Sequence, residues 1–185
     1  MNVALSKPSM TLEQFLVWED QQELRYEFDG FQPVAMTGVT EAHSAIQMNV
    51  TTALNMRLRG KPCRPHGSDL KIQVAGRIRY PDAFVVCSPI VPRNKVVTEP
   101  VVVFEVLSDS TADEDLMVKN AEYRATPSIK RYVVLRQDAA SAVVFSRMGD
   151  NWITEFVSGA EAILHLPELE LAIPLTEIYA DTGLL

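Results

Sequence analysis

Two acidic side chains lie in apolar surroundings. Asp82 follows Pro81 within residues 79–87 (RYPDAFVVC), and Glu105 lies within residues 99–108 (EPVVVFEVLS). A bare carboxylate in a buried strand costs several kcal/mol, so each needs a cation or hydrogen-bond donor beside it. Both runs predict strands that are consecutive in the chain, so the two side chains can converge on one cation. Oxygen ligands of this kind suit Mg²⁺ or Mn²⁺, which can activate water and neutralise a phosphate during in-line displacement.

Each carboxylate also has a simpler structural explanation. Asp82 could cap a turn after Pro81, and Glu105 could pair with a buried arginine or lysine. For either residue alone, this explanation is as good as metal binding. Two such carboxylates on consecutive strands favour a shared cation, so we predict Asp82 and Glu105 as catalytic metal ligands.

The next predicted helix carries a candidate catalytic lysine. Four of its polar residues are spaced to share one face: Asp115, Lys119, Glu122 and Tyr123. Lys119 could point back at the strand that carries Glu105, where its ammonium would position the attacking water or stabilise transition-state charge. The alternative is an exposed Asp115–Lys119 pair that contributes little. Periodicity alone does not choose between them.

Two other polar residues occupy suggestive positions. His43 lies in the first turn of the long predicted helix, and Glu27 lies just before the Asp29-Gly30 turn. Taken alone, a surface histidine and an ordinary strand glutamate are the simpler interpretations.

Composition limits the class of protein. With 185 residues, 47% of them hydrophobic, the chain is predicted to form one compact domain over residues 1–185. The net charge of −7 argues against a broad basic surface for nucleic acid, so any such contact must be local. Two basic groups could serve, although a solvated surface explains them more simply. They are Arg57, Arg59, Lys61 and Arg64, and then Arg124, Lys130 and Arg131.

Several features are absent from the sequence. It has no apolar run of about 20 residues and no signal-peptide pattern, which predicts a cytoplasmic protein without a membrane partner. Cys63 and Cys87 are too few for a disulfide framework and lack zinc-ligand spacing, so we expect buried thiols. The glycine motifs of dinucleotide-binding proteins, P-loop proteins and α/β-hydrolases are also missing.

The hydrophobic pattern predicts an α/β or α+β fold, a mixed sheet flanked by helices. A capping box at Thr11 begins a short helix, Asp29-Gly30 turns a hairpin, and a long helix runs from Thr40 to a stop at Gly60. The β-branched run 99–108 is expected to be the central strand. Other strands are expected at 71–74, 79–87, 130–136, 142–147, 151–157 and 161–166, with a helix from Ser110 or Thr111 to about Ala125 and a last one near 175–180.

Three segments identify a family resemblance: 79–86 (RYPDAFVV), 101–111 (VVVFEVLSDST) and 119–135 (KNAEYRATPSIKRYVVL). They resemble the Uma-two family, a branch of the PD-(D/E)XK nuclease superfamily, and the blocks keep the family's order over nearly the whole chain. The resemblance implies a restriction-endonuclease-like core in which Asp82 and Glu105 coordinate Mg²⁺ and promote phosphodiester hydrolysis. Leu107 stands where the D/E-x-K pattern has lysine, and Lys119 matches families in which the lysine has moved to the following helix.

The resemblance also implies supporting roles for three residues. Glu27 would make a further metal contact, His43 would contact substrate or water, and Tyr123 belongs to the K-x-x-E-Y-R block.

Three functional hypotheses follow. The leading one is an Mg²⁺-dependent endonuclease acting on DNA. The second is a nuclease fold that serves as a binding or assembly module with weak or no cleavage, and the third is a nuclease for RNA or single strands. Because cutting both strands of a duplex needs two active sites or two visits, a homodimer is plausible, with apolar segments such as 142–147 pairing at sheet edges.

Overall fold

The computed structural model describes residues 10–107, 114–159 and 161–185. The chain begins with a helix and a hairpin, as predicted. In the capping box, Thr11 Oγ1 accepts from the Gln14 amide at 3.2 Å and Gln14 Oε1 accepts from the Thr11 amide at 2.9 Å, which starts α1 (Leu12–Glu19). Strands β1 (Tyr26–Phe28) and β2 (Pro33–Ala35) pair antiparallel. Their turn is fixed by Asp29 Oδ1, which accepts from the amides of Phe31 and Gln32 at 2.8 Å.

The long helix and the central strand are also confirmed. Thr40 caps α2 (Glu41–Leu58). Strand β8 (Pro100–Leu107) lies inside a six-stranded sheet of order β11-β10-β9-β8-β6-β3. The partners of β8 are β6 (Ala83–Val86), antiparallel, and β9 (Arg131–Arg136), parallel. The predicted helix lies between the parallel strands β8 and β9 in the sequence, so the three elements form a strand–helix–strand unit.

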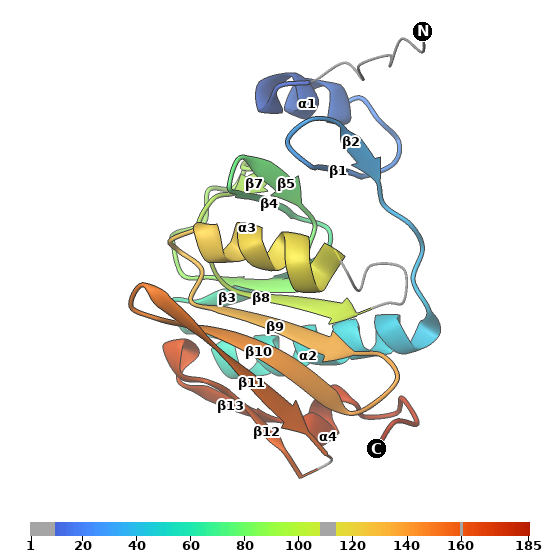
Figure 1. Ribbon diagram of the computed structural model, residues 1–185, viewed down its shortest axis with the longest axis vertical. Helices are drawn as coiled ribbons and strands as arrows, with labels where there is room; N and C mark the ends of the chain where they lie inside the picture. The colour runs from blue at the N-terminus through green and yellow to red at the C-terminus, as the bar shows by residue number, and fades with distance from the viewer. Residues whose placement is uncertain (1–9, 108–113, 160) are drawn as a thin grey trace, which may run out of the picture.

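Helices cover both faces of the six-stranded sheet (Figure 1). On one face, α2 packs Ile46, Val50 and Leu54 into the largest buried cluster. On the other face, α3 (Asn120–Ala125) lies between this sheet and the group formed by β4, β5 and β7. Tyr123 of α3 is buried against Tyr132. Cover on both faces explains why β8 is a nearly continuous apolar run, and it makes Glu105 an exception within that run.

A second, five-stranded sheet has the order β2-β1-β5-β4-β7. Its remaining strands are β4 (Lys71–Val74), β5 (Arg77–Arg79) and β7 (Val96–Val97). Residues 79–87 were expected to form one strand, and that expectation is wrong. Strand β5 ends at Arg79 and β6 begins at Ala83 in the other sheet, because Pro81 has no amide hydrogen with which to continue a ladder. Asp82 therefore lies at the junction between the two sheets.

The C-terminal part of the chain completes the six-stranded sheet and adds a hairpin. Strands β10 (Ser141–Met148) and β11 (Asn151–Ser158) continue the sheet beyond β9. Segment 142–147 therefore belongs to an interior strand, so its expected pairing with a second copy at a sheet edge is wrong. The predicted strand at 161–166 is β12 (Ile163–Leu166), and the predicted last helix is α4 (Leu175–Ile178).

Several details of the fold were not expected. Strands β3 (Arg64–Gly67), β7 and β13 (Leu171–Pro174) were not predicted, nor was the 3₁₀ turn Pro167–Leu169. The helix after β8 begins, in its described part, with the π-helical stretch η1 (Glu114–Lys119) and continues as α3. The caps predicted at Ser110 and Thr111 lie outside the described residues.

The cysteines do not form the buried thiols that the sequence suggested. Cys63 and Cys87 are half-buried and joined by a disulfide. The reason is the antiparallel register of β3 and β6, in which Arg64 pairs with Val86. Cys63, just before Arg64, therefore lies opposite Cys87, just after Val86.

No helix in the described part of the chain is both long enough and apolar enough to cross a membrane.

Candidate active site

Asp82 is held at the sheet junction by a hydrogen bond and by a close histidine. Its Oδ2 atom accepts from the Val106 amide at 2.7 Å and lies 3.2 Å from His43 Nε2. Ala83 pairs with Phe104 in the adjoining ladder, so Asp82 stands beside Glu105 in the next row. About one seventh of its side chain is exposed (14%), so the carboxylate borders solvent.

Glu105 is buried on β8 with two donors at one oxygen. Oε1 accepts from Lys119 Nζ at 3.0 Å and from the Tyr123 hydroxyl at 2.9 Å. Burial, reinforced by the negative charge of Glu105, raises the pKa of Tyr123 well above its ordinary value, so the phenol stays protonated and remains a donor. The pairing of Glu105 with a buried lysine, offered above as a structural explanation, is therefore present in the fold.

Lys119 ends the π-helical stretch and points inward. Its side chain is 9% exposed, so the alternative of an exposed pair with Asp115 on a solvated face is wrong. The Asp115 side chain itself lies outside the described residues. The ammonium lies between two carboxylates, 3.0 Å from Glu105 Oε1 and 3.9 Å from Glu27 Oε1. π-helical turns are rare and often occur at functional sites, which suits this position.

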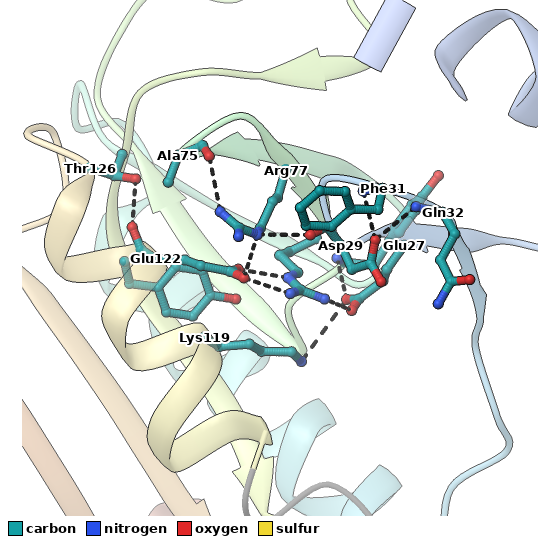
Figure 2. Close-up of polar contacts among 12 residues, drawn as sticks. Glu27, Asp29, Phe31, Gln32, Ala75, Arg77, Lys119, Glu122 and Thr126 are labelled. Atoms are coloured by element: carbon teal, nitrogen blue, oxygen red, sulfur yellow. Dashed lines mark hydrogen bonds and ion pairs between the residues drawn. The ribbon is translucent and has the colours of Figure 1, made fainter. Parts of the chain in front are cut away.

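Glu27 reaches the same centre from β1. Its Oε1 accepts from the Tyr80 amide at 2.9 Å, and its Oε2 accepts from Arg79 Nη1 at 2.9 Å. Burial alone would raise the pKa of Glu27, but the charges of Lys119 and Arg79 and the Tyr80 amide hold it below its ordinary value. Glu27 is therefore a carboxylate at neutral pH. Figure 2 shows it facing Lys119.

Sequence reasoning missed Arg79, the most buried charge of this centre. Its side chain is 1% exposed and donates through Nε and Nη2 to both carboxylate oxygens of Glu122, at 2.8 and 2.7 Å. Arg77 Nε lies 3.0 Å from Glu122 as well, and Figure 2 shows Glu122 between Arg77 and Lys119. The sequence held only an indirect signal: buried carboxylates need a nearby cation, but their presence does not identify which arginine or lysine provides it.

His43 approaches Asp82 from the first turn of α2. It is buried, and its Nδ1 atom is buried without a hydrogen-bond partner in the described part of the chain. One turn later, Gln47 donates through Nε2 to the Asp82 carbonyl at 3.0 Å and to Ser68 Oγ at 2.9 Å. Gln47 was not predicted from the sequence. Together these residues fix the chain around Asp82.

The carboxylates of Asp82 and Glu105 are oxygen ligands of the kind that a hard cation such as Mg²⁺ prefers. Within residues 10–107, 114–159 and 161–185, no three His, Cys, Asp or Glu side chains are grouped closely enough to enclose a metal ion. Mg²⁺ is, however, commonly held by one or two carboxylates, with water and substrate phosphate as its other ligands. Asp82 and Glu105, side by side at a partly open junction, fit that pattern. A metal contact by Glu27 stays a prediction.

Three of the basic residues singled out in the sequence have partners within the chain. Arg57 is paired with Glu177. Arg131 is buried, with Nε donating to Glu168 at 2.8 Å. Arg124 lies over the ring of Trp152. These contacts agree with a structural rather than a nucleic-acid-binding role for all three arginines.

The fold is a mixed α/β architecture of the restriction-endonuclease-like class, as predicted. A crystal structure described as that of "a putative nuclease belonging to DUF820" from Anabaena variabilis superposes on it with a TM-score of 0.75 at 19% identity. The match covers 92% of this chain and 98% of that chain. At this level of identity the likeness shows the fold.

The family itself is shown by sequence. The family model described as "Uma2: Putative restriction endonuclease" matches residues 12–176, so the chain belongs to the Uma2 family, as its motifs indicated. An uncharacterised protein of Synechocystis sp. is 29% identical over 176 residues, covering 93% of this chain and 92% of that protein. A second protein of the same organism is 25% identical over 168 residues, covering 88% and 95%.

Proposed function

We propose that this Uma2-family chain is a metal-dependent endonuclease that hydrolyses phosphodiester bonds, with DNA as its substrate. One observation carries the proposal: the Asp82 carboxylate accepts from the amide of Val106, the residue next to Glu105, and the buried ammonium of Lys119 lies 3.0 Å from Glu105. Two carboxylates can hold a divalent cation, and a lysine beside them can stabilise negative charge on a phosphate, so the three side chains suit phosphodiester hydrolysis.

Asp82 and Glu105 would hold Mg²⁺ or Mn²⁺. When bound, the ion would supply a lowered pKa for water and charge neutralisation at the phosphate. The Val106 amide and His43 orient Asp82, and the Tyr123 hydroxyl orients Glu105. Both carboxylates are thus fixed before any ligand arrives.

Lys119 would stabilise the negative charge that develops on the phosphate. Leu107, at the lysine position of the D/E-x-K pattern, carries no charge. The four-carbon stem of Lys119 lets its ammonium reach Glu105 from the neighbouring helix instead. His43 Nδ1, buried and without a partner among the described residues, would contact substrate or water. Glu27 places a second carboxylate 3.9 Å from the Lys119 ammonium.

DNA is favoured as substrate because the family description reads "Putative restriction endonuclease". With DNA as substrate, the site of action would be the cytoplasm. A homodimer would bring two active sites to one duplex. Segment 142–147 is not an edge, and β11, one of the two edge strands of the described six-stranded sheet, would take its place in the pairing.

A second candidate function is binding without cleavage. One reason is that Glu105 already accepts hydrogen bonds from Lys119 and Tyr123, and the lysine neutralises its charge. The other is that the described residues contain no group of three His, Cys, Asp or Glu side chains that could hold a metal ion. In that case the scaffold would hold nucleic acid or a protein partner, and Asp82 would contribute metal affinity alone.

Cleavage assays distinguish the two. Supercoiled plasmid, single-stranded DNA and RNA are incubated with pure protein and Mg²⁺ or Mn²⁺, or with chelator. Asp82→Asn and Lys119→Ala should abolish metal-dependent cutting. Asp150→Asn, the same change in the exposed β10–β11 turn, should retain it. Cutting that survives Asp82→Asn would overturn the proposed site, and a folded wild type that cuts none of the substrates would contradict the nuclease proposal and favour the binding function.

A further inference from the structure

Arg79 is a buried cation that the proposed chemistry does not use. It joins two carboxylates from different elements, Glu122 on α3 and Glu27 on β1, through three hydrogen bonds of 2.7 to 2.9 Å. Burial would lower the pKa of the guanidinium, but the bonds to Glu122 and the charge of Glu27 raise it instead. Arg79 is therefore a permanent cation in the interior.

The bond between Arg79 and Glu122 fixes a helix to a sheet. The guanidinium is planar, and both oxygens of Glu122 are engaged by it, so distance and orientation are set together. Glu122 follows Lys119 by one helical turn, and residues at this spacing share a face. The hydrogen bonds between Glu122 and Arg79 of β5 thus also set the position of the Lys119 backbone relative to β8.

Glu27 confines the lysine from the other side. Its Oε2 is held by Arg79, and its Oε1, held by the Tyr80 amide, lies 3.9 Å from Lys119 Nζ. A lysine side chain has four rotatable carbon–carbon bonds and is not rigid by itself. With Glu105 at 3.0 Å and Glu27 at 3.9 Å, the ammonium has a defined position.

We propose that Arg79 and Glu122 form a clamp that positions Lys119 at Glu105 for phosphodiester hydrolysis, an inference that rests on the proposed function. Arg79 and Glu122 are positioning residues, because they act through Lys119 and not on the substrate. The competing explanation is an ion-pair network that only stabilises the fold. The two differ in what they predict for the placement of Lys119 in a variant that still folds.

The chain offers matched controls for both residue types. Arg131 on β9 is a buried arginine paired with Glu168, and it lies opposite Val102 of β8, three residues before Glu105. Lys71 is a buried lysine paired with Glu19, with 6% of its side chain exposed against 9% for Lys119. The variants are Arg79→Lys and Glu122→Gln, with Arg131→Lys as control.

Lysine acylation by acetic anhydride, followed by mass spectrometry, reads the placement of Lys119 without requiring activity. In Arg79→Lys and Glu122→Gln, acylation of Lys119 should rise about tenfold, since losing charge-assisted hydrogen bonds shifts a local opening equilibrium by roughly that factor. Acylation of Lys71 should stay unchanged in the same samples. Arg131→Lys should leave both lysines as in wild type.

Cleavage kinetics supply the second measurement. With folded Arg79→Lys or Glu122→Gln, kcat should fall by about ten- to hundredfold while KM stays within about twofold, as expected for a misplaced catalytic group. Unchanged acylation of Lys119 in both variants would overturn the clamp, whatever the activity. If wild type does not cleave, acylation still decides the clamp and only the nuclease proposal fails. If Arg79→Lys does not fold, Glu122→Gln decides.

Discussion

Replacing Lys119 with methionine should remove a large part of the stability of the fold. Lys119 and Glu105 form an ion pair of 3.0 Å whose side chains are 9% and 5% exposed, and methionine keeps the length of the stem without the charge. Breaking a buried pair from one side costs about 3–5 kcal/mol. At roughly 2–4 °C per kcal/mol for a chain of this size, Tm should fall by about 6–20 °C.

A second substitution tests the cause of that loss. Adding Glu105→Gln to Lys119→Met removes the carboxylate that has lost its cation, while Tyr123 can still donate to the amide oxygen. The double variant should therefore be more stable than Lys119→Met alone, because removing both partners of a buried pair costs less than removing one. Lys95→Met breaks an exposed pair with Asp20, in which the side chains are 67% and 47% exposed, and should leave Tm nearly unchanged.

The assay is thermal and urea unfolding of five proteins, namely wild type, Lys119→Met, Glu105→Gln, the double variant and Lys95→Met, followed by circular dichroism at neutral pH in the presence of chelator. Chelator prevents a divalent cation from taking the place of the missing ammonium. The reasoning is refuted if Lys119→Met unfolds at the same temperature as Lys95→Met. It is also refuted if Glu105→Gln lowers stability in the Lys119→Met background by as much as it does in wild type.

Two further predictions concern acid and reduction. The pKa of Glu27 lies below its ordinary value of 4.5, so its charge stabilises the folded state above about pH 4.5, and that stabilisation is lost as the pH falls through the folded-state pKa. The difference in unfolding free energy between wild type and Glu27→Gln should therefore be largest near neutral pH and shrink in acid; a difference independent of pH would contradict this. Reduction of the Cys63–Cys87 disulfide, which links residues 24 apart in sequence, should lower the unfolding free energy by about 3 kcal/mol in urea titrations. Two free thiols in the unreduced, urea-unfolded protein would contradict it.

The chemistry of single residues made part of the site predictable. Asp82 and Glu105 stood out because a carboxylate in an apolar strand is costly, and that cost does not depend on the fold around it. The hairpin and the long helix carried local signals at Asp29 and Thr40, which the structure confirms.

The parts that escaped prediction depend on contacts between distant segments. Arg79 joins partners 43 and 52 residues away, and nothing next to it in the sequence marks it as buried. The break at Pro81 was visible, but the assignment of its two sides to different sheets was not. The Cys63–Cys87 bond follows from the register of β3 and β6, and β3 itself, containing Pro65 and Gly67, has an unusual composition for a strand.

The division of the centre between two sheets has a consequence for folding kinetics. The Lys119–Glu105 pair spans 14 residues, whereas Arg79 of β5 closes a loop of 52 residues to Glu27 in the same sheet and a loop of 43 residues to Glu122 on α3. Long loop closures are slow and are formed late unless they belong to the nucleus. Interactions absent from the transition state govern the rate of unfolding rather than that of folding. The charged centre would therefore be completed after both sheets have docked. It would slow unfolding, and so lengthen the lifetime of the native state, without speeding folding.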